Sequence, residues 1–322
     1  MKIIDCFLFS LELEMLFCRL ELLWNYVDYF IIVEANTTHT GIEKPFVFEE
    51  NKHYFSKYSD KIVYVKVEDM PILSDVENYK PVHVECLEYN NVLAGKGENH
   101  QRECGIRRGM SQISIDSNDL IISSDLDEIP DPKCFPLVIE RLQGTNLPIY
   151  IDMDHFWGDF SSYKKKWEDN SYWRGTAFQS GGVVKKTHEW FIKSRDRRFT
   201  NDLKRVIEKP RYNVDDLLIH GVVDTGCHFS WFGGNNMKTI KSNSFAHSDD
   251  PAGQHMGSYV KGSLKNVKLK DIQSDEQWEE FFDGTSRKVK EHDIQYISSI
   301  YHEMKKLYYE GNYLNDEKID NI

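Results

Sequence analysis

The sequence lacks paired cysteines, long apolar runs and an excess of positive charge. Its six cysteines, spread from position 6 to position 227, include no C-x-x-C pair, so they predict reduced thiols rather than a disulfide framework or a short-spaced metal site. No apolar run is long enough to span a membrane, and acidic residues come too early for a signal peptide. The net charge of −12 argues against a protein that coats nucleic acid. We therefore expect a soluble, cytoplasmic protein that binds no nucleic acid.

Apolar segments of strand length alternate with helical patterns over the first 130 residues. We expect strands at 2–9, 28–36, 61–69 and within 119–130, and helices at 10–27 and 98–113. Ser10 is a candidate N-cap for the first helix. This alternation predicts an α/β fold with a mostly parallel sheet flanked by helices.

The rest of the chain predicts a strand at 147–160, another within 220–234, and a helical C-terminal part. In that last part, residues 293–310 repeat apolar side chains at helical spacing. There is no internal repeat and no obvious linker between domains. We therefore expect one main domain over 1–262 and a helical C-terminal extension over 263–322 that packs on it.

Three carboxylates lie close together in "IISSDLDEIP" at 121–130, directly after an apolar run. Asp125 and Asp127 are two residues apart, so in extended backbone both side chains point to one side. Ligands of open α/β sheets bind beyond the carboxyl ends of the strands, and paired carboxylates suit Mg²⁺ or Mn²⁺. One interpretation is a metal that holds a substrate diphosphate. The other is that these acids only cap a following helix.

Several segments together resemble glycosyltransferase family 17, the β-1,4-mannosyl-glycoprotein 4-β-N-acetylglucosaminyltransferase family. They are "DCFLF" at 5–9, "VDYFIIVEANTTHTG" at 27–41, "SDLDEIP" at 124–130, "GCHFSWFGG" at 226–234 and "KSNSFAH" at 241–247. The resemblance implies a GT-A-type fold with its catalytic domain at 1–262, a UDP-sugar donor and inversion at the anomeric carbon. In the characterised branch the donor is UDP-N-acetylglucosamine. Cys227 departs from the pattern, which has Trp at that position.

The resemblance also implies catalytic and metal-binding roles. Asp125 and Asp127 would hold Mn²⁺ or Mg²⁺, although Asp125 could instead meet the ribose through the metal's water shell. His247 would be a further ligand, or else a packed or surface histidine, and the same two interpretations apply to His228. Asp224 would be the general base that deprotonates the acceptor hydroxyl, its alternative being a turn-forming residue.

Two further segments supply candidates for donor binding. Glu34, Asn36, Thr38 and His39 follow or end the second expected strand and would meet uracil or ribose; the alternative is an ordinary polar turn. Arg102 precedes the D-x-D motif and would pair with the diphosphate or brace the motif; the alternative is a surface helix charge.

The expected function is therefore metal-dependent, inverting transfer of a sugar, N-acetylglucosamine by resemblance, from a UDP-sugar to a hydroxyl of a glycan or saccharide acceptor. The lack of targeting signals fits a bacterial or viral enzyme. A phosphatase of the haloacid dehalogenase type is one alternative, but it expects Thr or Val where this chain has Ile129. A non-catalytic sugar-binding protein is another, and the intact pair of Asp125 and Asp127 argues against it.

Overall fold

The computed structural model describes residues 1–10, 12–39, 41, 43–72, 89–143, 146, 148–151, 153–157, 163–164, 175–186, 218–219 and 226–230. The predicted domain boundary at 262 and the predicted helix at 293–310 lie outside these residues.

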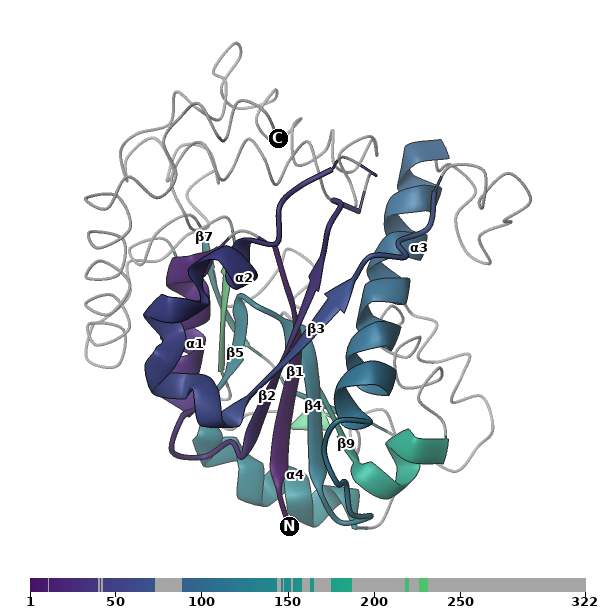
Figure 1. Ribbon diagram of the computed structural model, residues 1–322. Helices are drawn as coiled ribbons and strands as arrows, with labels where there is room; N and C mark the ends of the chain where they lie inside the picture. The colour runs from purple at the N-terminus through teal and green to yellow at the C-terminus, as the bar shows by residue number, and fades with distance from the viewer. Residues whose placement is uncertain are drawn as a thin grey trace.

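The centre of the fold is a seven-stranded sheet of order β10-β6-β9-β4-β1-β2-β3. Figure 1 labels five of its strands, from β9 through β4, β1 and β2 to β3. The first four strands are parallel to one another, as predicted: β1 (Ile3–Phe9), β2 (Tyr29–Ala35), β3 (Ile62–Val67) and β4 (Leu120–Asp125). The antiparallel β9 (Ala177–Ser180) joins them to β6 (Ile149–Ile151), which pairs in parallel with β10 (Leu218–Ile219). The predicted α/β class with a mostly parallel sheet is confirmed.

A second, smaller sheet has the order β5-β11-β7-β8. Its strands are β5 (Glu128–Pro130), β11 (Gly226–Ser230), β7 (Asp154–Trp157) and β8 (Tyr163–Lys164). The prediction of one strand at 147–160 is therefore wrong, because this segment forms β6 in the large sheet and β7 in the small one. Alternation of apolar and polar residues cannot reveal that the chain changes sheets between them.

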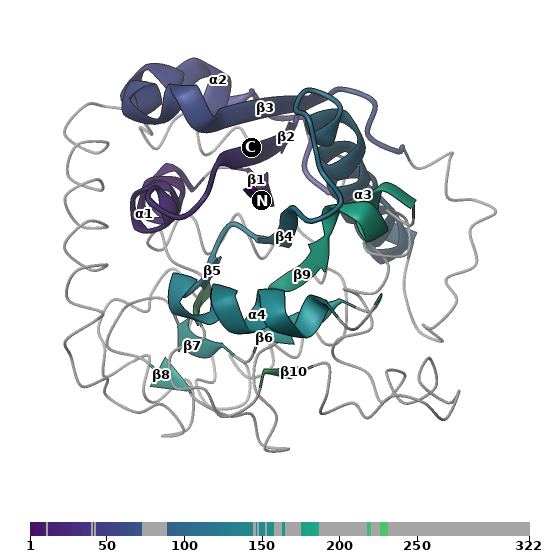
Figure 2. The same ribbon diagram turned by 90° about the horizontal axis from the view of Figure 1, so that it is seen from below.

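Helices cover both faces of the large sheet (Figure 2). They are α1 (Leu13–Leu23), α2 (Val47–Asn51) with the 3₁₀ segment η1 (Lys52–Lys61), α3 (Tyr89–Cys104) with the π-helical segment η3 (Gly105–Gly109), and α4 (Phe135–Leu142) with the 3₁₀ segment η4 (Pro132–Cys134). Ser10 does not cap α1, which begins later, at Leu13, with Glu12 in the N-cap position.

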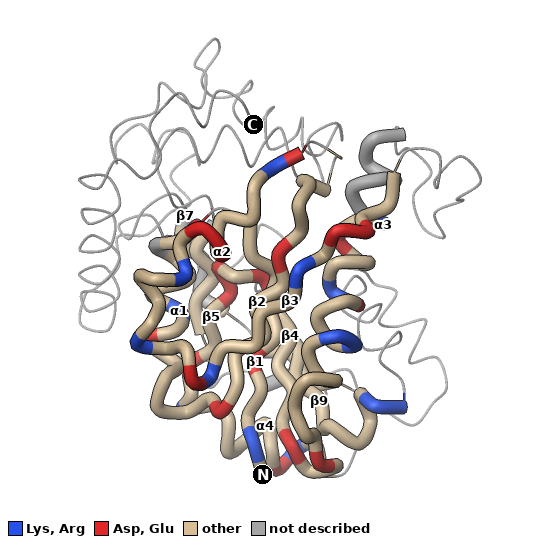
Figure 3. Tube along the Cα trace, in the orientation of Figure 1, with Lys and Arg blue, Asp and Glu red and all other residues tan. Residues whose placement is uncertain are grey.

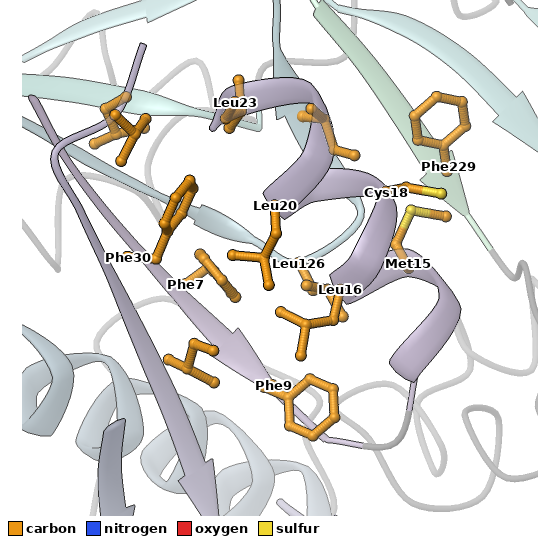
Figure 4. Packing of buried hydrophobic residues seen from close by; sticks show 14 of the residues in the cluster. Phe7, Phe9, Met15, Leu16, Cys18, Leu20, Leu23, Phe30, Leu126 and Phe229 are labelled. Carbon is orange, nitrogen blue, oxygen red and sulfur yellow. The ribbon is translucent and has the colours of Figure 1, made fainter. Parts of the chain in front are cut away.

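Successive side chains along each strand point to opposite faces of the sheet, so a hydrophobic core forms on each face. Phe7 and Phe30 point to one face, where they pack with Leu16 and Leu20 of α1 (Figure 4). Cys6 and its neighbours on β2 and β3 point to the other face, against α3 and η3. Gly105 and Gly109, the first and last residues of η3, permit this close packing. A Cβ atom at Gly105 would lie 2.4 Å from the Val33 side chain, and one at Gly109 would lie 2.4 Å from the Ile31 side chain.

The described helices contain none that is long and apolar enough to cross a membrane. Five cysteines lie in the described part of the chain, four of them buried, and no disulfide bond joins any two of them. Burial raises the pKa of the Cys134 thiol to about 12 and that of Cys104 to about 11, so both are protonated at neutral pH.

Candidate active site

Asp125 and Asp127 lie at the carboxyl edge of the large sheet. Asp125 is the last residue of β4, opposite Leu8 of β1, and Asp127 lies in the turn that leads to β5. Leu126, between them, is buried among the side chains of α1 (Figure 4), whereas both flanking carboxylates are partly exposed. The two carboxylates therefore leave the core while the residue between them anchors the turn. The expected extended backbone does not continue to Asp127, because Leu126 and Asp127 form a turn.

Arg19 of α1 holds this turn from inside the protein. Its guanidinium is fully buried and pairs with both oxygens of the Asp5 carboxylate at 2.7 and 2.8 Å. The Nη1 group donates to three backbone carbonyls of the turn, and Nη2 also donates to the Ser124 hydroxyl. The three acceptors are the carbonyl oxygens of Asp125 at 2.8 Å, Leu126 at 3.1 Å and Glu128 at 2.9 Å. Every nitrogen of the Arg19 guanidinium is thus used, and Nη1 fixes the backbone that carries the two aspartates.

Glu128 closes the same turn from its other end. Its buried carboxylate accepts a hydrogen bond of 2.8 Å from the backbone N–H of Asp125. Gly175 leaves room for this carboxylate, because a Cβ atom there would lie 2.2 Å from it. Glu128 therefore supports the turn from within.

Arg102 of α3 holds the side chain of Asp125. Its Nη2 group lies 2.5 Å from an oxygen of Asp125 and 2.5 Å from an oxygen of Glu98, one helical turn earlier. Figure 3 shows acidic and basic positions together on α3. Burial opposes the charge of Arg102, but the two carboxylates outweigh it and raise the pKa of Arg102 above its ordinary value. The alternative interpretation, an ordinary surface helix charge, does not hold, since only 4% of Arg102 is exposed.

Asp127 lies beside His228 of β11. One carboxylate oxygen of Asp127 is 3.7 Å from Nε2 of His228. The backbone carbonyl of Asp127 accepts a hydrogen bond of 2.8 Å from the backbone N–H of Phe229. The antiparallel pairing of β5 with β11 brings these residues together across about one hundred positions of sequence. His228 is buried, as the core interpretation requires, and it also contacts a candidate metal ligand.

The loop after β2 contributes two of the predicted donor-binding residues. His39 is buried, and its Nε2 lies 2.9 Å from the side-chain oxygen of Gln101. The side-chain nitrogen of Gln101 donates a hydrogen bond of 2.8 Å to the Val33 carbonyl. Burial lowers the pKa of His39 below its ordinary value, so the ring is neutral. Thr38 is buried, and its carbonyl accepts from the N–H of Gly41.

Glu34 holds α2 to the sheet. Its fully buried carboxylate accepts from the backbone N–H groups of Val47 and Phe48 at 2.5 and 3.1 Å, from the Tyr64 hydroxyl at 2.7 Å and from Lys44 at 3.2 Å. These contacts give Glu34 a structural role, and the donor-binding role stays a prediction.

Several buried polar atoms at this edge have no hydrogen-bond partner within the described part of the protein. Five such atoms follow β1 or β2 or lie on α3: Ser10 Oγ, Asn36 Oδ1, Thr37 Oγ1, Asn99 Oδ1 and Arg102 Nη1. A buried donor or acceptor left without a partner costs about 1–3 kcal/mol, so such atoms are rare unless a ligand or water meets them. Their distribution fits a polar ligand at the carboxyl edge.

The remaining predicted residues, Asp224 and His247, lie outside the described residues. Asp125 and Asp127 supply the hard oxygen atoms that Mg²⁺ or Mn²⁺ prefers. No described group of three ligating side chains with atoms within 4.8 Å of one another includes either aspartate. A metal held there would therefore take its other ligands from water, from a diphosphate or from residues beyond the described ones.

The sequence profile of glycosyltransferase family 17 matches residues 1–202 of this chain. No curated protein matches the sequence of this chain. A solved structure of the galactosyltransferase LgtC with donor and acceptor sugar analogues is 10% identical, with all of both chains covered and a TM-score of 0.31. An active-site mutant of LgtC is 12% identical over 90% of this chain and 98% of its own, with a TM-score of 0.27. The profile match, which spans more than half of the chain, carries the assignment.

Proposed function

Because this chain belongs to glycosyltransferase family 17, we propose that it transfers N-acetylglucosamine from a UDP-sugar to a saccharide hydroxyl, with Mn²⁺ or Mg²⁺ bound at Asp125 and Asp127. The observation that carries the proposal is the arrangement of those two carboxylates at the carboxyl edge of the sheet, where Arg19 fixes their backbone and Arg102 fixes one side chain.

The two aspartates would hold the metal through oxygen atoms that face away from the core. A metal bound there would offset the negative charge that develops on the departing UDP. Asp125 is oriented by Arg102, and Asp127 lies beside His228, so each carboxylate has a neighbour that limits its rotation. Such orientation matters because ligand groups outside the metal's immediate contacts tune its binding.

Arg102 has its Nη1 group left for the donor. Its Nη2 is committed to Glu98 and Asp125, whereas its buried Nη1 has no acceptor in the described part of the chain. A diphosphate oxygen is a suitable acceptor, because guanidinium groups bind phosphate through short, charge-assisted hydrogen bonds. Arg102 would therefore both orient a metal ligand and bind the leaving group.

The nucleoside end of the donor would meet the loop after β2. The side-chain oxygen of Asn36 and the hydroxyl of Thr37 are buried in this loop, and neither has a hydrogen-bond partner among the described residues. The neutral ring of His39, held by Gln101, and the buried Thr38 complete the polar lining. We propose Asn36, Thr38 and His39 as contacts to uridine, and Asp224 as the base that deprotonates the acceptor hydroxyl in the inverting reaction.

The test is UDP release from a panel of UDP-sugars, with and without Mn²⁺, by the native chain and by Asp127→Ala. We expect metal-dependent release that is fastest with UDP-N-acetylglucosamine. The Asp127→Ala variant should lose about 10²–10³-fold in rate, the usual effect of removing one charge-stabilising group.

Asp116→Ala is the matched control, because this exposed aspartate precedes β4 at the opposite end of the strand. It should release UDP at the native rate. Equal losses in both variants would mean that the effect comes from folding, and release without metal would contradict the proposed role of the aspartates.

A further inference from the structure

Three ligating side chains of different chemistry converge where α3 meets the end of β3. Asp69 follows β3, and His100 and Cys104 lie one helical turn apart on α3. The Nε2 atom of His100 is 3.5 Å from a carboxylate oxygen of Asp69 and 3.5 Å from Sγ of Cys104, and the three ligand atoms lie within 4.8 Å of one another. A nitrogen, a sulfur and an oxygen thus lie close together.

This cluster is separate from the Asp125–Asp127 site. His100 and Cys104 are each two residues from Arg102, and residues two apart on an α-helix point about 200° from each other. Arg102 points to Asp125, whereas His100 and Cys104 point to Asp69. The cluster therefore lies on a different face of the helix.

The spacing of the three groups is compatible with a bound ion. The contact of 3.5 Å between His100 and Asp69 exceeds the usual N–H···O range of about 2.7–3.2 Å. Zinc binds nitrogen, oxygen and sulfur ligands at about 2.0–2.3 Å, so two ligand atoms at the tetrahedral angle lie about 3.4–3.6 Å apart. The two contacts of 3.5 Å fall in that interval.

The neighbouring groups orient the ligands and leave a route for the ion. Arg108 donates a hydrogen bond of 2.6 Å to one carboxylate oxygen of Asp69. This contact directs the other oxygen of Asp69 to His100. Cys104 is buried, whereas the Asp69 side chain is about half exposed, so an ion would enter from the Asp69 side. A carboxylate held by a second residue is typical of metal sites.

We propose that Asp69, His100 and Cys104 form a Zn²⁺ site that ties the end of β3 to α3, with solvent or a further group in the fourth position. The imidazole and the thiolate that forms when the metal displaces the Cys104 proton select zinc over Mg²⁺ and Mn²⁺, which prefer oxygen ligands. The ion would fix the helix that carries Arg102 without touching the reacting groups. This proposal is independent of the sugar-transfer reaction.

Cobalt(II) is the probe, because a cobalt–thiolate bond adds a charge-transfer absorption in the near ultraviolet. The full chain, reduced and stripped of metal, is titrated with Co²⁺ and then with Zn²⁺. We expect the thiolate absorption to appear with one equivalent of Co²⁺ and to disappear when Zn²⁺ displaces it. Cys104→Ala should abolish it, and Cys134→Ala, which removes another buried free thiol, should leave it unchanged.

The proposal is overturned if the native chain gives no thiolate absorption at saturating Co²⁺, or if Cys104→Ala keeps it. If Cys104→Ala does not fold, His100→Gln decides, because its side chain is about one-third exposed and its loss leaves no core cavity. This variant should bind Co²⁺ at least about tenfold more weakly. Unchanged affinity would also overturn the proposal.

Discussion

Replacing Arg19 by Met removes the group that fixes the turn carrying Asp125 and Asp127. Methionine fills much of the same space but offers no hydrogen-bond donor. The change leaves the Asp5 carboxylate buried without its counter-charge and leaves three carbonyl oxygens of the turn without their donor. We therefore expect effects on both stability and activity, and the two can be separated.

The expected loss of stability follows from the burial of both partners. The side chains of Arg19 and Asp5 are 0% exposed, and breaking a buried pair by removing one partner costs about 3–5 kcal/mol. Adding Asp5→Asn to Arg19→Met removes the uncompensated charge. Because the two side chains are in direct contact, the double variant should lose about 1–3 kcal/mol less than the sum of the single variants.

Activity should not recover with stability. The Asp5→Asn change restores no donor to the carbonyls of Asp125, Leu126 and Glu128, so the turn stays unsupported in the double variant. Denaturation by urea, followed by circular dichroism, measures the free energy of unfolding. Metal-dependent UDP release, assayed at a temperature where each variant is folded, measures the positioning of the aspartates, and we expect about a 100-fold loss.

The control is Arg107→Met, which removes an exposed arginine whose ion pair among the described residues is the surface pair with Glu103. Such pairs contribute about 0–1 kcal/mol, so both readouts should stay near native. The reasoning would be refuted by native activity in a folded Arg19→Met variant. It would also be refuted by a double variant whose activity recovers together with its stability.

Three further outcomes are expected. Arg102→Lys keeps the charge but cannot reach two carboxylates and a phosphate at once, so UDP release should fall about 100-fold while the circular dichroism spectrum stays native. Gly175→Ala places a Cβ atom 2.2 Å from the Glu128 carboxylate and should lower the free energy of unfolding by about 1–3 kcal/mol, measured in urea. Burial lowers the pKa of His39 from 6.5, so the unfolded chain binds the proton more readily and stability falls as the pH drops below 6.5. The thermal midpoint of His39→Gln should therefore depend less on pH between 7 and 5, and an equal slope in both proteins would contradict this.

The parallel strands and the place of the D-x-D motif could be predicted from the sequence because both depend on local pattern. The runs that form β1, β2 and β4 are apolar on both faces, which is typical of buried parallel strands. Asp125 and Asp127 follow such a run directly, so their position at the carboxyl edge follows from the strand itself.

The support of the motif could not be predicted in the same way, because its partners are far apart in sequence. Arg19 binds carbonyl groups 106 to 109 positions away, and no spacing rule links them. A signal was present nonetheless, since Arg19 lies on the apolar stripe of α1 between Leu16 and Leu23. Asp5 lies likewise inside an apolar strand. Two opposite charges at otherwise apolar positions indicate a buried pair.

The contact between His228 and Asp127 depends on pairing between strands of the small sheet. β11 pairs with β5 in antiparallel register, so that His228 lies opposite Glu128, the neighbour of Asp127. The sequence predicts a strand near 226–230 but not its partner. A histidine at a buried strand position therefore fits a packed core residue equally well until the register is known.

The two arginines hold the motif from opposite sides and for different reasons. Every guanidinium nitrogen of Arg19 donates to Asp5, to Ser124 or to the backbone of the turn, so none is left for a ligand. Arg102 instead retains Nη1, a buried donor without a described acceptor, next to the partly exposed carboxylate of Asp125. Loss of Arg19 should therefore weaken metal and donor binding together, because both depend on the turn. Loss of the Arg102 guanidinium should weaken donor binding more than metal binding. Calorimetric titration with Mn²⁺ alone measures metal binding, and titration with UDP in the presence of Mn²⁺ measures donor binding, so the two effects can be separated.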